Sequence, residues 1–266
     1  MNERTPSPEV RVLPDTAALY RAGAEAFAAA AARAVAARGR FVVALSGGST
    51  PKGLFALLAG DAALRAVVPW EKLHVFWGDE RPVGPDHVES NYRMAREALL
   101  AHVPIPTAQI HRIRGEAPDP AQAAAEYEAT LREALGALTG GSGGSADTPP
   151  VFDLVLLGMG PDGHTASLFP GTTALAETRR LVVSNWVGKL DTERITLTAP
   201  ALNAARHVLF VVGGDDKAPA LKSVLEGRFE PQQLPAQLIH PEAGTLTWLV
   251  DAAAARLLSA GTAGRV

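Results

Sequence analysis

Short apolar runs alternate along the chain with longer segments of helical character. Residues 153–157 read Asp-Leu-Val-Leu-Leu, a run typical of a buried parallel strand. Residues 15–38 are rich in alanine and begin with Asp15, a favourable N-cap for a helix. The same criteria predict further strands near residues 10–13, 40–45, 73–77, 181–184, 194–198, 208–212 and 245–250. They predict further helices near residues 51–59, 90–100, 120–138, 201, 217–225 and 251–259.

This order of elements predicts the fold class. Strands that alternate with helices form a mostly parallel sheet with helices on both of its faces. We therefore expect an α/β protein, a three-layer α/β/α Rossmann-like fold, in a single domain over residues 1–266. Residues 139–150 are rich in Gly and Ser, and a buried strand follows them directly. We expect this segment to be a flexible surface loop.

Composition narrows the classes of function. Of 266 residues, 47% are hydrophobic and 20% are charged, as in ordinary soluble globular proteins. The 25 Lys and Arg against 28 Asp and Glu give a net charge of −3, which argues against a nucleic-acid or anionic membrane surface. The absence of Cys excludes disulfides, thiolate catalysis and Cys-ligated zinc. The N-terminus lacks the apolar core of a signal peptide, and no segment is apolar enough to span a bilayer, so we expect a cytoplasmic protein.

The glycine-rich loop after strand 153–157 carries a candidate acid/base pair, Asp162 and His164. Open α/β sheets bind their ligands at the carboxyl ends of the strands, which is where this loop begins. His changes its charge near neutral pH, and a nearby carboxylate can orient it and support its protonated form. The pattern therefore indicates a catalytic dyad. The alternative is a solvated turn in which Asp and Gly serve only the backbone conformation.

A second loop points to an anionic ligand. Gly47 and Gly48 follow a predicted strand and allow backbone N–H groups to face a ligand at the start of the next helix. The hydroxyls of Ser49 and Thr50 can complete such a site. Because the glycine spacing fits neither the Walker nor the dinucleotide pattern, a small phosphate ester is favoured over a nucleotide. A Gly-Gly turn with a helix cap is the alternative. A similar Gly-Gly turn precedes Lys217, which is expected early in a helix.

A third loop places Asp79, Glu80 and Arg81 at the end of strand 73–77. Arg is well suited to the recognition of phosphate or carboxylate groups, and Pro82 can help to hold it in place. An exposed ion cluster is the alternative for this loop. Three loops of this type at strand ends make a shared ligand site more plausible than any single loop does.

With these loops, the chain resembles the 6-phosphogluconolactonase family, and more distantly the glucosamine-6-phosphate deaminases of the same superfamily. The resemblance runs from about residue 10 to about residue 258 and leaves residues 139–147 unaligned. Its motifs are Leu-Ser-Gly-Gly-Ser-Thr-Pro at 45–51, Trp-Gly-Asp-Glu-Arg at 77–81, Ser-Asn-Tyr at 90–92, the segment 158–170, Glu-Arg-Ile-Thr-Leu at 193–197 and the segment 213–217. Several motifs in the same order are far more specific than any one of them.

The resemblance implies hydrolysis of 6-phospho-D-glucono-1,5-lactone to 6-phospho-D-gluconate in the oxidative pentose phosphate pathway, without a metal or organic cofactor. It implies that His164 is the base for water attack and that Arg81 belongs to the active site. It also implies that residues 47–50, Arg194 and Lys217 bind the phosphate. Asp162 or Asp79 would support His164. The expected partner is a small sugar-phosphate lactone rather than a nucleic acid or membrane, and the expected state is a monomer or a homodimer.

Three other functions remain open from the sequence. The deaminase relatives carry a Glu five residues after the His, but this chain has Phe169 there. A serine hydrolase would use Ser46, Ser49 or Ser167, yet none lies in a Gly-x-Ser-x-Gly elbow, and Ser167 is expected in a helical turn. A non-enzymatic sugar-phosphate sensor would keep the phosphate loop without needing the Asp-x-His pair. The motifs favour the lactonase.

Overall fold

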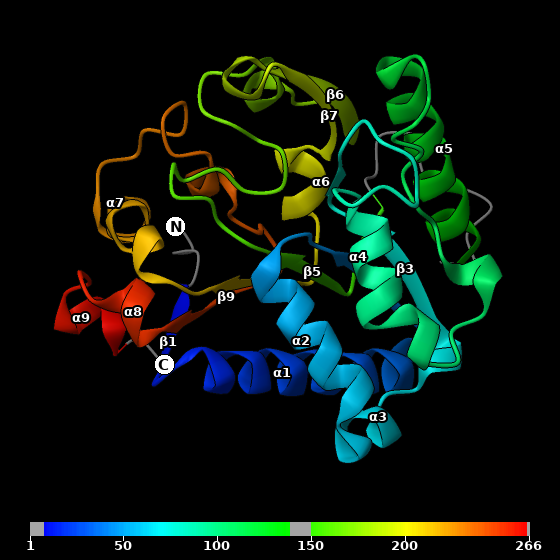
Figure 1. Cartoon of the computed structure of the whole chain (residues 1–266), viewed down its shortest axis with the longest axis horizontal. Coiled ribbons are helices and arrows are strands. Elements are labelled where there is room, and N and C mark those ends of the chain that lie inside the picture. The colour runs from blue at the N-terminus through cyan, green and yellow to red at the C-terminus, as the bar shows by residue number, and fades with distance from the viewer. Residues whose placement is uncertain (1–7, 139–149, 265–266) are drawn as a thin grey trace.

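A six-stranded, fully parallel sheet forms the centre of the protein in the computed structural model, which describes residues 8–138 and 150–264. The strand order is β1-β9-β8-β5-β2-β3. The strands are β1 (Glu9–Leu13), β2 (Phe41–Leu45), β3 (Leu73–Trp77), β5 (Leu154–Leu157), β8 (His207–Val212) and β9 (Thr245–Asp251). The parallel order confirms the predicted α/β class (Figure 1).

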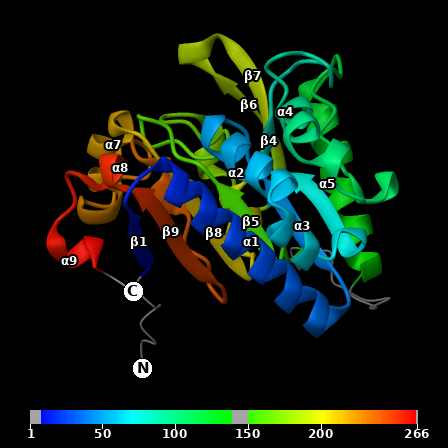
Figure 2. The ribbon, with the colours of Figure 1, turned by 60° about the horizontal axis from the view of Figure 1, so that its bottom comes forward.

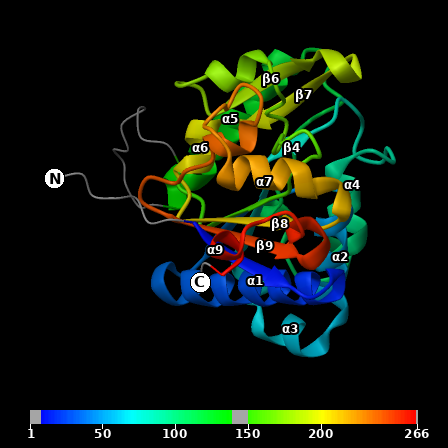
Figure 3. The same cartoon turned by 90° about the vertical axis from the view of Figure 1, so that its left-hand side faces the viewer.

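Helices cover both faces of this sheet, which gives three layers (Figure 3). Helices α1 and α3 lie on one side of the sheet and α6 and α7 on the other. The helices are α1 (Thr16–Arg38), α2 (Ser49–Gly60), α3 (Ala62–Val67), α4 (Asn91–Ala98), α5 (Pro120–Leu138), α6 (Ala199–Asn203), α7 (Ala218–Glu226), α8 (Ala252–Ala255) and α9 (Ala260–Ala263). No helix within the described ranges is long and apolar enough to cross a membrane.

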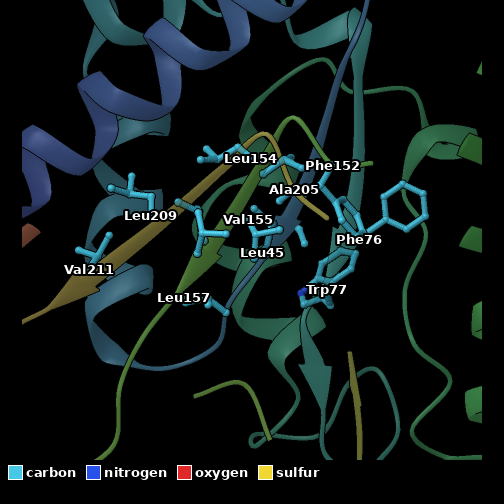
Figure 4. Packing of buried hydrophobic residues seen from close by; sticks show 14 of the residues in the cluster. Leu45, Phe76, Trp77, Phe152, Leu154, Val155, Leu157, Ala205, Leu209 and Val211 are labelled. Atoms are coloured by element: carbon cyan, nitrogen blue, oxygen red, sulfur yellow. The ribbon is translucent and has the colours of Figure 1, made fainter. Parts of the chain in front are cut away.

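The apolar runs of the sequence become the most deeply buried strands. Every residue of β2 and of β5 is buried, because helices cover both faces of a parallel sheet. Figure 4 shows Leu45, Val155 and Leu209 of three neighbouring strands within this core. The predicted cap of α1 is also confirmed, because the Asp15 side chain accepts a hydrogen bond from the backbone N–H of Ala18 at 2.8 Å.

A second, three-stranded antiparallel sheet corrects the prediction for residues 181–184 and 194–198. These segments form β6 (Val182–Val187) and β7 (Thr192–Leu197), which pair with each other and with the short strand β4 (Asp79–Glu80). A parallel pair needs a crossover of a dozen or more residues, whereas a few residues suffice to turn an antiparallel pair. Here only residues 188–191 connect the two strands. The resulting hairpin projects beyond the main sheet (Figure 2).

Several predicted boundaries also shift. Helix α2 begins at Ser49 rather than at residue 51, so Ser49 and Thr50 lie in its first turn and Gly48 is its N-cap. Lys217 ends a short 3-10 turn before α7 and does not lie in the helix itself. The helix predicted over residues 251–259 is shorter, because α8 covers only Ala252–Ala255, and the separate helix α9 begins at Ala260. Of the predicted loop 139–150, residues 139–149 lie outside the described residues.

The strand order creates one crevice at the carboxyl edge of the sheet. Strands β2 and β5 are neighbours in the sheet. After β2 the next strand of this sheet is β3, on the side away from β5, and after β5 it is β8, on the side away from β2. The loops after two neighbouring strands therefore diverge between β2 and β5, which is the switch point where open α/β sheets bind their ligands.

Candidate active site at the switch point of the sheet

The loops that follow β2, β4, β5 and β8 meet around a cavity of about 250 Å³. Predicted site residues that line it are residues 47–50, Asp79, Arg81, His164 and Lys217. Asp162 lies directly behind His164, and Arg194 lies nearby without lining the cavity. The three loops singled out in the sequence thus converge on one site.

Asp162 and His164 form a hydrogen-bonded pair. The Asp162 Oδ1 atom lies 2.5 Å from the His164 Nδ1 atom and also accepts the backbone N–H of His164 at 3.2 Å. An Nδ1–H that donates to the carboxylate leaves the lone pair of the ring on Nε2. Nε2 has no hydrogen-bond partner among the described residues. His164 lines the cavity, and its unpaired Nε2 atom can act there as a base.

The glycines of this loop are required by the position of the imidazole ring. A Cβ atom at Gly160 would lie 2.1 Å from the Cε1 and Nδ1 atoms of His164, so any larger residue would displace the ring. The backbone N–H of Gly160 donates to the carbonyl of His164 at 2.9 Å and closes the loop. Gly163 has a φ of 77°, a left-handed conformation that favours glycine. The loop thus holds both members of the dyad in one conformation.

The surroundings of His164 favour its neutral form. Burial, followed by the positive charges of Lys217, Arg194 and Arg81, lowers the pKa of His164 to about 4. The negative charge of Asp79 opposes this shift. The Asp162 carboxylate opposes it as well, because it stabilises the imidazolium. The direction is downward because burial is the largest cause, so His164 is an unprotonated base at neutral pH.

Asp79 has a different set of partners and does not touch the His164 ring. It is buried, and its carboxylate accepts hydrogen bonds from the Ser167 hydroxyl at 2.7 Å and from the Asn91 amide at 3.1 Å. The expected helical turn at Ser167 is wrong, because an isolated antiparallel bridge between Thr165 and Leu168 closes this turn. Asp79 acts on His164 only through its charge, whereas Asp162 contacts it directly.

Arg81 is held at the cavity wall by the buried carboxylate of Glu80. Glu80 accepts the backbone N–H groups of Arg81, Asn91 and Tyr92 at 2.8–2.9 Å, and burial raises its pKa. The guanidinium of Arg81 donates to the carbonyl of Glu89 at 2.7 Å, while its Nε atom is buried with no partner in the described residues. A fixed guanidinium with an unused donor is suited to an anionic or carbonyl oxygen.

The Gly47-Gly48 loop leads into the N-terminus of α2. Gly48 is the N-cap residue, has a φ of 103°, and provides no side-chain cap for the first helical N–H groups. These groups and the positive end of the helix dipole are free to bind an anion. A Cβ atom at Gly47 would lie 1.8 Å from the Asn91 side chain, which fixes the approach of the loop to Asp79.

Lys217 reaches the same cavity from the loop after β8. Gly214 in this loop also has a φ of 103°, and its N–H donates to the buried carboxylate of Asp251 at 3.1 Å. The Lys217 ammonium forms an ion pair with the exposed side chain of Asp216 at 2.6 Å. The sequence predicted that this turn resembles the Gly47-Gly48 loop, and the backbone agrees, because the second glycine of each has the same φ.

Arg194, like Asp162, is a predicted site residue that does not line the cavity. It lies on β7, opposite Asn185 of β6, and is about half-buried. Burial and the positive charge of Arg81 lower its pKa, and its own charge lowers the pKa of His164. Arg194 thus belongs to the electrostatic surroundings of the dyad. Its predicted contact with a phosphate stays a prediction.

Three residues near the dyad were not predicted as site residues. Phe169 stacks on the His164 ring with 4.0 Å between the ring centroids. Lys189 from the hairpin contacts the Asp162 carboxylate, and Asn91 links Asp79 to the Gly47 loop. The motifs around Phe169 and Asn91 were visible in the sequence, but no pattern marked Lys189. Among the described residues, no group of three or more His, Asp or Glu side chains could hold a metal ion.

Residues 14–248 match the family described as glucosamine-6-phosphate isomerases/6-phosphogluconolactonase. A 6-phosphogluconolactonase from Nostoc sp. is 45% identical, covering 94% of this chain and 98% of that protein. The chain belongs to this family. The 6-phosphogluconolactonase of Homo sapiens is 42% identical over 84% of this chain and 83% of its own length. The structure of 6-phosphogluconolactonase from Trypanosoma cruzi superposes with a TM-score of 0.80 at 30% identity, covering 97% of this chain and 100% of that one. These relatives make the chain a hydrolase of the lactonase branch.

Proposed function

We propose that the chain hydrolyses 6-phospho-D-glucono-1,5-lactone to 6-phospho-D-gluconate in the oxidative pentose phosphate pathway, with His164 activating the water. The observation that carries this proposal is the His164 imidazole, which is bound to Asp162 through Nδ1 and lines a cavity beside the Gly47-Gly48 loop. The names of the relatives support the same substrate.

The reaction requires little beyond a positioned base. A lactone is an activated ester, so water can attack its carbonyl carbon without a covalent enzyme intermediate. His164 takes a proton from this water as the new C–O bond forms, and it returns the proton to the ring oxygen as the ring C–O bond breaks. Asp162 keeps the His164 imidazole in the required tautomer and stabilises the imidazolium between these steps. The guanidinium of Arg81 would stabilise the oxyanion that develops on the carbonyl oxygen.

The phosphate would bind at the opposite side of the cavity. Residues 47–50 supply N–H groups and hydroxyls at the start of α2, and Lys217 supplies a positive charge beside them. Arg194 would add a second charge from β7. A phosphate fixed in this way holds the distant end of the sugar, so that the carbonyl carbon meets the water next to His164.

Phe169 argues against the deaminase alternative. It occupies the position at which the deaminase relatives carry a Glu, and its ring packs against the His164 ring at an interplanar angle of 22°. An apolar ring at this place supplies no acid or base to an aldose–ketose isomerisation. It does remove one face of the imidazole from water, which supports an unprotonated base.

The serine-hydrolase and sensor alternatives also lose support. The Ser167 hydroxyl is 1% exposed and donates to Asp79, so it is not available as a nucleophile. Neither Ser46 nor Ser49 has a hydrogen bond to a His among the described residues. A sensor would not require a base bound to a carboxylate at the cavity wall. Activity in the cytoplasm, as a monomer or a homodimer and without a cofactor, remains our expectation.

A single set of assays tests the proposed function. Purified protein is incubated with freshly generated 6-phospho-D-glucono-1,5-lactone and, separately, with glucosamine 6-phosphate. We expect lactone hydrolysis well above the spontaneous rate and no release of ammonia. Ammonia release from glucosamine 6-phosphate would support the deaminase instead. Binding of 6-phospho-D-gluconate without any turnover would indicate a sensor.

A further inference from the structure

We infer that Lys189 is a positioning residue for the reaction, which holds the Asp162 carboxylate against His164 from the tip of the β6–β7 hairpin. This inference rests on the proposed function of the dyad. It concerns a residue outside the predicted site and outside the cavity lining. Lys189 comes from the antiparallel sheet, whereas the dyad follows a strand of the main sheet.

The contacts of Asp162 show why this lysine matters. One carboxylate oxygen, Oδ1, faces the His164 ring nitrogen and backbone N–H. The other oxygen, Oδ2, is bound by the ammonium of Lys189. A carboxylate with both oxygens engaged is fixed in rotation, so the oxygen that faces Nδ1 cannot turn away. Lys189 thus completes a chain of contacts through Asp162 to His164.

A second contact holds Lys189 in the same place. Its Nζ atom lies 4.8 Å from the centroid of the Phe169 ring, within the range of a cation–π interaction. Phe169 in turn stacks on His164. The lysine therefore touches two of the groups that surround the imidazole, although half of its own side chain is exposed. An unrelated surface ion pair would not have this second contact.

The base of the hairpin is tied to the dyad loop, so the position of its tip is determined. The buried Asn185 amide of β6 donates to the carbonyl of Ser167 at 2.9 Å, and Thr196 of β7 accepts the N–H of Ser167 at 3.2 Å. Asp191, in the left-handed conformation with a φ of 49°, completes the turn after Lys189. These contacts fix the hairpin beside the dyad loop, so that Lys189 at its tip lies against Asp162.

The charge of Lys189 should also affect the titration of His164. The charged groups that face His164 come from several elements: Asp162 from its own loop, Asp79 from β4, Arg81 after β4, Arg194 from β7, Lys217 from the turn before α7, and Lys189 through Asp162. The ion pair with Lys189 offsets part of the negative charge that Asp162 presents to the imidazole. Loss of the ammonium would leave that negative charge uncompensated, so the pKa of His164 would rise.

The test compares Lys189→Met, which keeps an unbranched side chain but removes the ammonium, with Lys189→Arg, which keeps the charge. For Lys189→Met we expect kcat at neutral pH to fall by about tenfold, as when an orienting partner of a functional side chain is lost, with little change in KM. The acid limb of the kcat–pH profile should move to higher pH. Lys189→Arg should restore both. Lys72→Met, at an exposed lysine before the amino end of β3, is the matched control.

A double-mutant cycle and a titration make the inference decisive. In an Asp162→Asn background, Lys189→Met should cause no further loss of kcat, because its partner is already gone. An NMR titration of the His164 ring, assigned by its absence in His164→Gln, should show a raised pKa in Lys189→Met even if the natural substrate is a different one. An unchanged kcat and His164 titration in Lys189→Met would overturn the inference. A raised KM with unchanged kcat would also overturn it, because it would place Lys189 on the substrate.

Discussion

Replacement of His164 with Gln is expected to lower kcat for lactone hydrolysis by about 10²–10⁴-fold, the usual contribution of a positioned acid/base group. Gln can still accept and donate hydrogen bonds, but it cannot take a proton from water. The phosphate-binding groups lie on other loops, so 6-phospho-D-gluconate should bind with nearly unchanged affinity. The effect should therefore appear in kcat and hardly in KM.

The measurement needs a control for the spontaneous reaction and one for the substitution itself. Rates are recorded against the hydrolysis of the lactone in buffer alone. His102→Gln changes an exposed histidine that follows α4 and does not line the cavity, and it should leave kcat unchanged. Near-normal turnover by His164→Gln above the spontaneous rate would rule out His164 as the base.

Lys217→Ala is expected to raise KM by about 10- to 100-fold, the equivalent of the 1.5–3 kcal/mol of a hydrogen bond to a charged group. The ammonium lies at the cavity wall beside the N-terminus of α2, where the phosphate is proposed to bind. The fall in kcat should be smaller, because the base is intact and only the positioning of the sugar suffers. Arg194→Ala should act in the same direction.

The affinity for 6-phospho-D-gluconate, measured by calorimetry, gives the direct readout of this prediction. The matched control is Lys222→Ala, which removes an exposed lysine from α7 whose ion-pair partner is Glu226, away from the cavity. If Lys217→Ala and Arg194→Ala both bind 6-phospho-D-gluconate as tightly as the unchanged protein does, the phosphate does not bind where we propose.

The main sheet and the loops of the site could be predicted because local signals and the fold agree. The runs that became β2 and β5 are continuously apolar, and each is followed within two residues by glycine, which favours a loop there. The carboxyl ends of parallel strands meet at one edge, so the loops after these strands could be expected to converge. The position of Asp162 beside His164 follows from their separation of two residues in a tight loop.

The antiparallel hairpin and its lysine could not be predicted in the same way. The apolar pattern of β6 and β7 is compatible with either strand direction, and only the short connection at residues 188–191 indicates a hairpin. Lys189 lies 27 residues from Asp162, in the turn of a hairpin that belongs to a different sheet from β5. Its contact depends on hydrogen bonds of Asn185 and Thr196 that fix the hairpin, and such tertiary contacts leave no local pattern in the sequence.

The dependence of kcat on pH tests most directly the central claim that neutral His164 is the base. Burial and three cations lower its pKa, so the active unprotonated form persists below the ordinary His value of about 6.5. A bound phosphate offsets part of the cationic charge but leaves the imidazole buried. The account predicts that kcat is level around neutral pH and falls along one acid limb centred between about 4 and 6.5. An acid limb centred above pH 6.5, or the same limb in the residual activity of His164→Gln, would contradict it.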